Sequence, residues 1–377
     1  MNEKKLRIVD CDAHVEECEE TFSEQFFDSN FADRRPHMVL EGDYPQWAMG
    51  DERHSQLTGR GAYNVGPFTY KGKRMRSEYG TSGDDLASAE MRRTDLRVKE
   101  MLAENIEHSV IFPTLFLKWP LVEDVDYGVA ICQSYNNWMS YRCAEQEGLE
   151  WVSTVPLAID TVDVAIEEML RAKSIGAVGV MILGLVGDHM LHEAPLKPFF
   201  AAAAKHNISV NIHVGFPSPG MANVCDNMDF HFIGPFGTSV HMGFLAIVMG
   251  GVLDEFPTLK VSFLEAGCDW VPYMLGRMEE RFTMKPKSGR AVYGSERHPM
   301  EIVNDGNVFI HAEIIDKTIP LVLDMVGPDV LVFASDIPHA HRHPNAGALL
   351  YQRADIEKDM VTKILWDNPA RLFDLDV

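Results

Sequence analysis

The chain has 377 residues, of which 46% are hydrophobic and 24% charged. These fractions are ordinary for a globular protein with a large core, and they exclude a collagen, a coiled coil or a disordered chain as the state of the whole. The 56 acidic residues outnumber the 34 lysines and arginines, which gives a net charge of -22. Such a surface repels phosphate backbones and anionic lipids, so we expect a small-molecule substrate and neither nucleic acid nor membrane as a partner.

The sequence also bears on location. No apolar run approaches the roughly 20 residues that a membrane span needs, and the first residues show no apolar signal core before a cleavage site. The six cysteines are scattered without a C-x-x-C spacing, which is typical of reduced thiols. We therefore expect a cytoplasmic protein.

Short β-rich runs alternate with longer helical periodicities along the chain. Several of the β-rich runs are almost continuously apolar, as in a parallel sheet covered on both faces. The predicted strands are residues 7–14, 108–114, 151–158, 177–183, 208–215, 260–267, 308–313 and 330–336.

Helices are predicted between these strands. They are residues 86–104, 125–147, 161–174, 196–206, 240–255, 269–283, 316–326 and 356–366. Eight strand–helix units in order indicate an α/β fold, a single (β/α)8 TIM barrel over residues 1–377. The alternative is a doubly wound open sheet, which is weakened because no Gly-x-Gly-x-x-Gly follows the first strand.

Two long segments interrupt the alternation. Residues 21–85 follow the first strand, and residues 216–238 follow the fifth; both are rich in glycine, proline and aromatic residues. They lie on the loop face where barrel active sites form. The aromatic content favours an ordered cover, so residues 21–85 are interpreted as an inserted cap or lid, with an oligomer contact as the alternative.

Histidine and carboxylate side chains end five of the predicted strands. In a barrel these ends converge on one mouth. Side chains two apart on a strand also share a face. A mixed nitrogen and oxygen set of this kind is typical of zinc, manganese or iron sites. The residues are Asp12 and His14, His213, Glu265, Glu313, and Asp336 with His339 after it.

Several motifs carry a resemblance to a known family. They are VDCDAH (9–14), NIH (211–213), GVLDEFP (251–257), FLEAGCDWVP (263–272), FASDIPH (333–339) and DNPARLF (367–373). With them the chain resembles the amidohydrolase-related (amidohydrolase 2) family of metal-dependent barrels. That family includes aminocarboxymuconate semialdehyde decarboxylase and resorcylate decarboxylase. The resemblance covers nearly the whole chain apart from the first insertion.

The resemblance implies roles for individual residues. Asp12, His14, His213 and Asp336 match the metal positions of the family. Glu265 falls at the acid/base position, and Glu265, Asp336 and His339 are the catalytic candidates. The lysine that bridges two metals in dinuclear relatives has no counterpart in residues 177–183, so one divalent ion, zinc or manganese, is expected. The surplus of ligand-type side chains, including Glu313, leaves open a dinuclear iron or manganese site, or groups that orient the ligands.

We expect a metal-dependent hydrolase that acts on a small organic molecule through metal-activated water. One alternative is a metal-dependent, non-oxidative decarboxylase of a small carboxylic acid. Further alternatives are a dinuclear oxygen-activating enzyme and an inactive barrel subunit. The expected assembly is a homo-oligomer, with a hetero-oligomer containing a related chain as the alternative.

Overall fold

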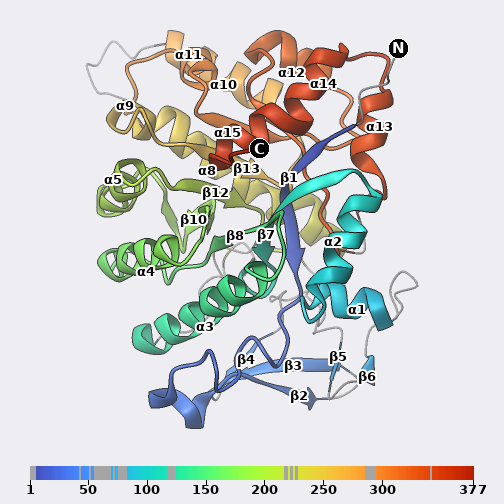
Figure 1. Ribbon diagram of the computed structural model, residues 1–377. Helices are drawn as coiled ribbons and strands as arrows, with labels where there is room; N and C mark the ends of the chain where they lie inside the picture. Colours follow the sequence, from blue (N-terminus) through green and yellow to red (C-terminus); the bar gives the residue numbers. More distant parts are fainter. Residues whose placement is uncertain are drawn as a thin grey trace.

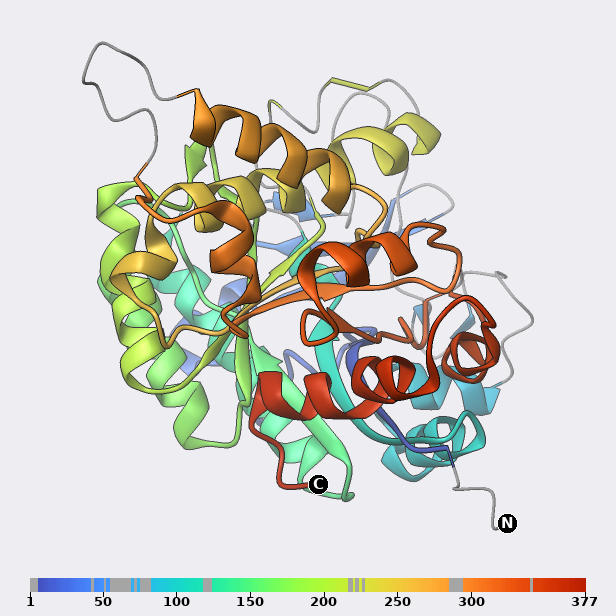
Figure 2. The ribbon, with the colours of Figure 1, turned by 90° about the horizontal axis from the view of Figure 1, so that it is seen from above.

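The computed structural model describes residues 6–41, 44–50, 52–54, 69–70, 73–74, 83–117, 124–215, 220, 224–225, 228–284, 294–339 and 342–377. Eight strands form one sheet in the order β1-β7-β8-β9-β12-β13-β14-β15, and each ladder along that order is parallel. Helices follow the strands in turn and surround them (Figure 1, Figure 2). The predicted (β/α)8 barrel is confirmed, which excludes the doubly wound open sheet.

Each predicted strand overlaps a strand of the barrel. These are β1 (Ile8–Val15), β7 (Ile106–Pro113), β8 (Leu149–Ser153), β9 (Gly179–Leu183), β12 (Ser209–His213), β13 (Val261–Leu264), β14 (Val308–His311) and β15 (Leu331–Val332). The helices between them are α1 (Gly83–Ala89), α2 (Thr94–Ala103), α3 (Val125–Cys143), α4 (Val162–Ser174), α5 (Lys197–Lys205), α7 (Met228–His231), α8 (Gly237–Met249), α9 (Val252–Glu255), α10 (Val271–Thr283), α11 (Pro299–Asn304), α12 (Ile319–Val326), α13 (Ala346–Gln352), α14 (Lys358–Thr362) and α15 (Asn368–Phe373).

Two predicted helices are wrong as single units. Residues 86–104 form α1 and α2, because Met91 between them has a left-handed φ of 51°. Residues 240–255 form α8 and α9, which are separated at Gly251 with a φ of 83°. A left-handed residue cannot continue a right-handed helix, and a hydrophobic periodicity that runs through such a residue does not reveal it. The predicted loop 216–238 is also helical from Met228 onward.

The barrel closes through an irregular seam between β15 and β1. Backbone hydrogen bonds run from Cys11 N to Phe333 O (3.0 Å), from Asp336 N to Asp12 O (2.9 Å) and from His14 N to Ile337 O (2.6 Å). β1 also carries a register shift between Asp10 and Ala13. Such irregularities are frequent beside active sites, where they redirect side chains.

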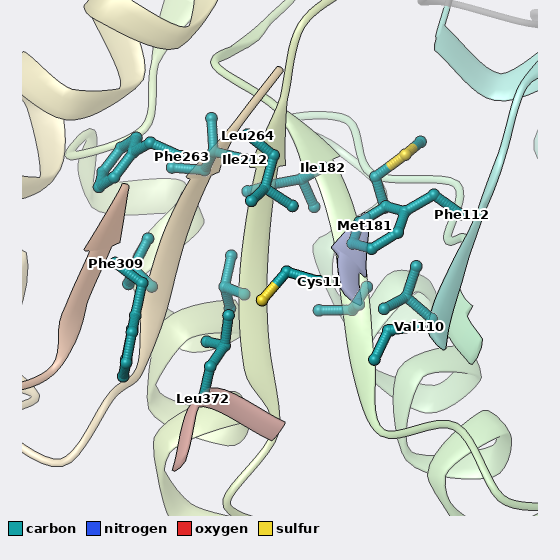
Figure 3. Packing of buried hydrophobic residues seen from close by; sticks show 14 of the residues in the cluster. Cys11, Val110, Phe112, Met181, Ile182, Ile212, Phe263, Leu264, Phe309 and Leu372 are labelled. Carbon is teal, nitrogen blue, oxygen red and sulfur yellow. The ribbon is translucent and has the colours of Figure 1, made fainter. Parts of the chain in front are cut away.

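One hydrophobic cluster joins the strands to the surrounding helices. The side chains labelled in Figure 3 come from six of the barrel strands and from α15, including Cys11, Val110, Met181, Phe309 and Leu372. All of the labelled side chains are at most 5% exposed. A core of this size holds the strand ends rigidly, which is the condition for a precise site at the mouth.

The described part of the insertion is ordered and joined to the core. It contains a small antiparallel sheet of β2 (His37–Glu41), β3 (Tyr44–Met49) and β4 (Glu52–His54). Trp47 is 4% exposed and packs edge-on against Phe22 at a ring distance of 5.1 Å. Figure 1 shows this sheet beyond the end of β1 that carries His14. Short strand pairs also occur at β5 (Thr69–Tyr70) with β6 (Lys73–Arg74), and at β10 (Leu185–Val186) with β11 (His189–Met190).

One helical stretch of the described chain, Phe232–Met249, has the length and composition of a membrane span. Just over half of it (56%) is buried inside the protein. Phe244 of α8 packs against Phe263 of β13 and against Trp270. These contacts are those of a core helix that covers the barrel, and we interpret the stretch in that way.

Candidate metal centre

Four of the predicted site residues come together at the mouth of the barrel. Asp12 and His14 lie on β1, His213 is the last residue of β12, and Glu265 directly follows β13. One ligand atom from each lies within 4.8 Å of the others. Asp12, His14 and His213 are at most 1% exposed. The strand ends therefore converge as a barrel requires, and they form a group that could hold a metal ion.

The distances within this group are short. Nε2 of His14 lies 3.2 Å from Nε2 of His213. Oδ1 of Asp12 lies 3.3 Å from Nε2 of His14, and Oδ2 of Asp12 lies 3.2 Å from Nε2 of His213. Oε2 of Glu265 is 3.2 Å from Nε2 of His213 and 4.0 Å from Nε2 of His14.

The contacts of the Nδ1 atoms determine which nitrogen of His14 and of His213 carries the hydrogen. Nδ1 of His14 lies 3.2 Å from Pro113 O, and Nδ1 of His213 lies 3.0 Å from Val214 O. Because a carbonyl only accepts, each Nδ1 carries a hydrogen, and each neutral ring presents a lone pair at Nε2. Two lone pairs that face each other at this distance need a cation between them.

The spacing and the donor types fit a metal ion. Two ligand atoms about 2.1 Å from one ion, at angles of about 90–110°, lie about 3.0–3.4 Å apart. The distances between His14, His213 and Asp12 fall in this range. Imidazole with several carboxylates is a donor set that suits manganese or iron as well as zinc.

In the metal-free protein a proton takes the place of the cation. Burial alone would lower the pKa of His213, but the negative charges of Asp12 and Glu265 outweigh it and raise the pKa to about 9. Burial would likewise raise the pKa of Asp12, but His213 and His14 hold it well below its usual value. Asp12 is therefore ionised, and His213 is protonated at neutral pH.

Metal binding at neutral pH is therefore expected to displace about one proton from His213. Its raised pKa means that the protonated ring stabilises the metal-free fold below about pH 6.5 and that this contribution is lost as the pH rises through about 9. Apparent Mn²⁺ affinity should increase roughly tenfold per pH unit up to about pH 9 and then level off. Calorimetric titration in two buffers of different ionisation enthalpy measures the released proton. An affinity that is flat between pH 6.5 and 9 would contradict the assignment.

Asp336 and His339 adjoin this group through a shared histidine. His14, Asp336 and His339 form a second group of ligand-type side chains within 4.8 Å. Oδ1 of Asp336 lies 3.8 Å from Nε2 of His14 and 2.6 Å from Nδ1 of His339. The rings of His339 and His14 stack at 4.2 Å. Thr114 Oγ1 is 3.0 Å from Nε2 of His339, a contact that the sequence did not indicate.

Two of the acids at the centre have unusual backbone conformations. Glu265 and Asp336 have left-handed φ angles of 59° and 56°. Such a conformation costs a non-glycine residue about 1–2 kcal/mol, and it persists where the surrounding structure enforces it. In both cases the chain turns directly at the end of a strand and directs the carboxylate toward His14 or His213.

Glu313 lies outside both groups of ligand-type residues. It is half-buried; burial raises its pKa, and the negative charges of Asp316, Glu265 and Asp336 raise it further. It therefore belongs to the same acidic region of the mouth. Its predicted role at a second metal, or as a group that orients the ligands, stays a prediction.

His311, the last residue of β14, is a further histidine at the mouth of the barrel, and it is not among the predicted site residues. The ladders pair His213 with Leu264, and His311 with Val332, in register, so the His311 side chain shares the inner face of the barrel with His213. It is 3% exposed, and among the described residues neither ring nitrogen has a hydrogen-bond partner. The signal was present, because His311 lies near the end of the predicted strand 308–313, but an isolated histidine at that position is more often a core residue.

Replacing His311 by leucine is expected to raise the free energy of unfolding by about 1–2 kcal/mol, because two buried nitrogens without partners disappear. Thermal unfolding of the metal-free protein measures this change. The matched variant His189→Leu, at an exposed position on β11, should leave the midpoint unchanged. A lower midpoint for His311→Leu would show that the ring has a stabilising partner in solution.

Comparisons with known proteins identify relatives of this chain. A family model described as amidohydrolase matches residues 9–375. The 2-amino-3-carboxymuconate-6-semialdehyde decarboxylase of Dictyostelium discoideum is 21% identical over 290 residues, which are 75% of this chain and 77% of that protein.

Solved structures share the fold. An amidohydrolase from Mycobacterium avium subsp. paratuberculosis has a TM-score of 0.76 at 18% identity, with both chains covered completely. A dihydroxybenzoic acid decarboxylase from Polaromonas sp. JS666, solved with manganese and the inhibitor 2-nitroresorcinol, has a TM-score of 0.63 at 20% identity. That match covers 79% of this chain and 91% of the other.

The fold and the centre define a barrel enzyme with a group of side chains that could hold a divalent metal ion. The chain belongs to the amidohydrolase 2 family, as the match over nearly its full length shows.

Proposed function

We propose that this enzyme is a metal-dependent, non-oxidative decarboxylase of a small carboxylic acid whose carboxylate is attached to an unsaturated or aromatic carbon. The observation that carries the proposal is the buried group of Asp12, His14, His213 and Glu265 at the mouth of the family barrel. The relatives named as decarboxylases support it over the hydrolase that the sequence favoured.

We assign the metal ligands to Asp12, His14, His213 and Asp336. A bound divalent ion would supply a Lewis acid that polarises the carboxylate of the substrate, and this set of two imidazoles and two carboxylates suits manganese as well as zinc. Glu265, whose negative charge acts on His213 in the metal-free protein, would take up a proton from solvent beside the reacting carbon. When the bond between that carbon and the carboxylate breaks, CO₂ leaves and the proton passes to the carbon, so the reaction consumes no oxidant.

Isotopes separate this reaction from hydrolysis. The enzyme is loaded with Mn²⁺ and incubated in D₂O or in H₂¹⁸O with 2,6-dihydroxybenzoate and related hydroxybenzoates. Decarboxylation releases CO₂ and places one deuterium on the carbon that lost it, with no ¹⁸O in the organic product. No CO₂ from any of these acids, together with incorporation of ¹⁸O into the acids released from their esters or amides, would instead favour the hydrolase. The His213→Ala protein controls for contaminating activity.

Metal content tests the number of ions. Protein purified without added metal should contain about one equivalent of manganese or zinc. The second group, His14 with Asp336 and His339, favours the dinuclear alternative as a second candidate. About two equivalents including iron, together with consumption of oxygen, would establish that alternative and overturn the decarboxylase.

We further propose that the insertion, residues 21–85, acts as a cap over the mouth. The support is its start shortly after His14 and the packing of Trp47 in the core cluster. Deleting residues 44–70 should raise KM at least tenfold while the metal stays bound, since a cover that grips substrate adds binding energy. Unchanged kinetics with dissociation of an oligomer would assign the segment to assembly. The predicted homo-oligomer is measured in the same experiment by light scattering.

A further inference from the structure

The ligand-type residues lie on both sides of the barrel seam. Asp12 and His14 belong to β1, whereas Asp336 and His339 follow β15, which is only two residues long. The ladder therefore ends before the segment that carries Asp336 and His339. Their position relative to β1 depends on the backbone hydrogen bonds of the seam and on the side chains that hold this segment.

Arg97 of α2 makes such contacts from outside the barrel. Its side chain is fully buried. Nη2 donates to His14 O at 2.7 Å, Nη1 donates to Ile337 O at 3.2 Å, and Nε donates to Ser88 O at 3.4 Å. Because the guanidinium is planar and rigid, it braces the backbones of His14 and Ile337, the residue after Asp336, which the hydrogen bond from His14 N to Ile337 O already joins.

Asp10 makes the complementary contacts on the same seam. Its Oδ1 accepts from Ser335 N at 2.8 Å, and its Oδ2 accepts from Ser335 Oγ at 2.5 Å and from Ser109 Oγ at 3.1 Å. Ser335 directly precedes Asp336. Asp10 thus accepts hydrogen bonds from Ser335, and Arg97 donates one to Ile337 O, so the two side chains hold the residues on either side of Asp336.

Stability alone does not account for this pair. Asp10 and Arg97 are both completely buried. Burying two charges is costly, and well-packed apolar side chains stabilise such a position at least as well. What apolar side chains do not supply is directional hydrogen bonding to defined backbone atoms.

We propose that Arg97 and Asp10 are positioning residues, which hold Asp336 and His339 at the distances from Asp12 and His14 that a bound divalent ion requires. This inference rests on the proposed metal site. It extends the site by two residues that touch neither the ion nor the substrate.

The test measures metal binding directly. Metal-free wild type, Arg97→Lys and Asp10→Asn are titrated with Mn²⁺, with the free ion followed by electron paramagnetic resonance. They are also titrated with Co²⁺, whose visible absorption reports its coordination geometry. Each variant should weaken Mn²⁺ binding by about ten- to hundredfold, the range for groups that orient ligands, and should change the intensity of the Co²⁺ spectrum. The control Arg93→Lys, at the start of the same helix in an exposed pair with Asp95, should match the wild type.

The outcomes separate the two proposals. Wild-type Mn²⁺ affinity and Co²⁺ spectra in Arg97→Lys, even with a lower unfolding midpoint, would make the pair purely structural and overturn the inference alone. A wild type that binds neither ion would overturn the proposed function together with the inference. If Arg97→Lys does not fold, Ser335→Ala removes a single hydrogen bond to Asp10. A severalfold weaker Mn²⁺ affinity in that variant supports the inference, and an unchanged affinity overturns it.

Discussion

Replacing His213 by alanine is expected to remove metal and activity together. His213 contributes the nitrogen that lies within 3.2 Å of His14, Asp12 and Glu265, so its loss removes a ligand atom and leaves a gap in the group. Affinity for Mn²⁺ should fall by more than about hundredfold, since even groups that only orient ligands contribute ten- to hundredfold. Elemental analysis and turnover, measured on the same sample, check the result.

The barrel itself should survive this change. Asp12 keeps His14 as a partner at 3.3 Å, so its buried carboxylate is not left alone. Far-ultraviolet circular dichroism should therefore show a folded protein. His206→Ala, at an exposed position just before β12, is the matched control and should keep both metal and turnover. Full metal content and full turnover in His213→Ala would mean that the site lies elsewhere.

The barrel could be predicted because its strands repeat one simple pattern. Apolar runs such as those of β9 and β14 are buried on both faces, and that burial produces the same sequence pattern each time. The breaks at Met91 and Gly251 were missed because a single left-handed residue does not change the hydrophobic periodicity around it. The backbone conformation at such a residue depends on tertiary packing, and the hydrophobic periodicity carries no information about that packing.

The candidate site also has residues that could be predicted from the sequence and residues that could not. Asp12, His14, His213 and Glu265 end strands, and the fold brings strand ends together, so their proximity follows from topology. Arg97 lies in a helix and acts on backbone oxygens that every residue possesses. Thr114 reaches His339 through a hydroxyl on a neighbouring strand end. The contacts of Arg97 and Thr114 depend on how distant parts of the chain are placed in the fold, and no sequence motif indicates them.

Replacing Glu265 by glutamine is expected to lower turnover by roughly 10²–10⁴, the usual contribution of a general acid or base. Glutamine keeps the size of the side chain and an oxygen that can accept a hydrogen bond, but it cannot release or take up a proton at the reacting carbon. Because the assigned ligands are untouched, Mn²⁺ content should stay near that of the wild type. Single-turnover kinetics with elemental analysis measure both quantities, and Glu301→Gln on α11 serves as an exposed control.

Metal content decides between two roles for this carboxylate. Oε2 of Glu265 is as close to Nε2 of His213 as Asp12 is, which is a distance that a ligand would also have. If Glu265→Gln loses metal together with turnover, Glu265 binds the ion, and another group must donate the proton. If turnover falls while the metal remains, the left-handed turn at Glu265 directs a proton donor toward the substrate. Unchanged turnover would remove Glu265 from the mechanism altogether.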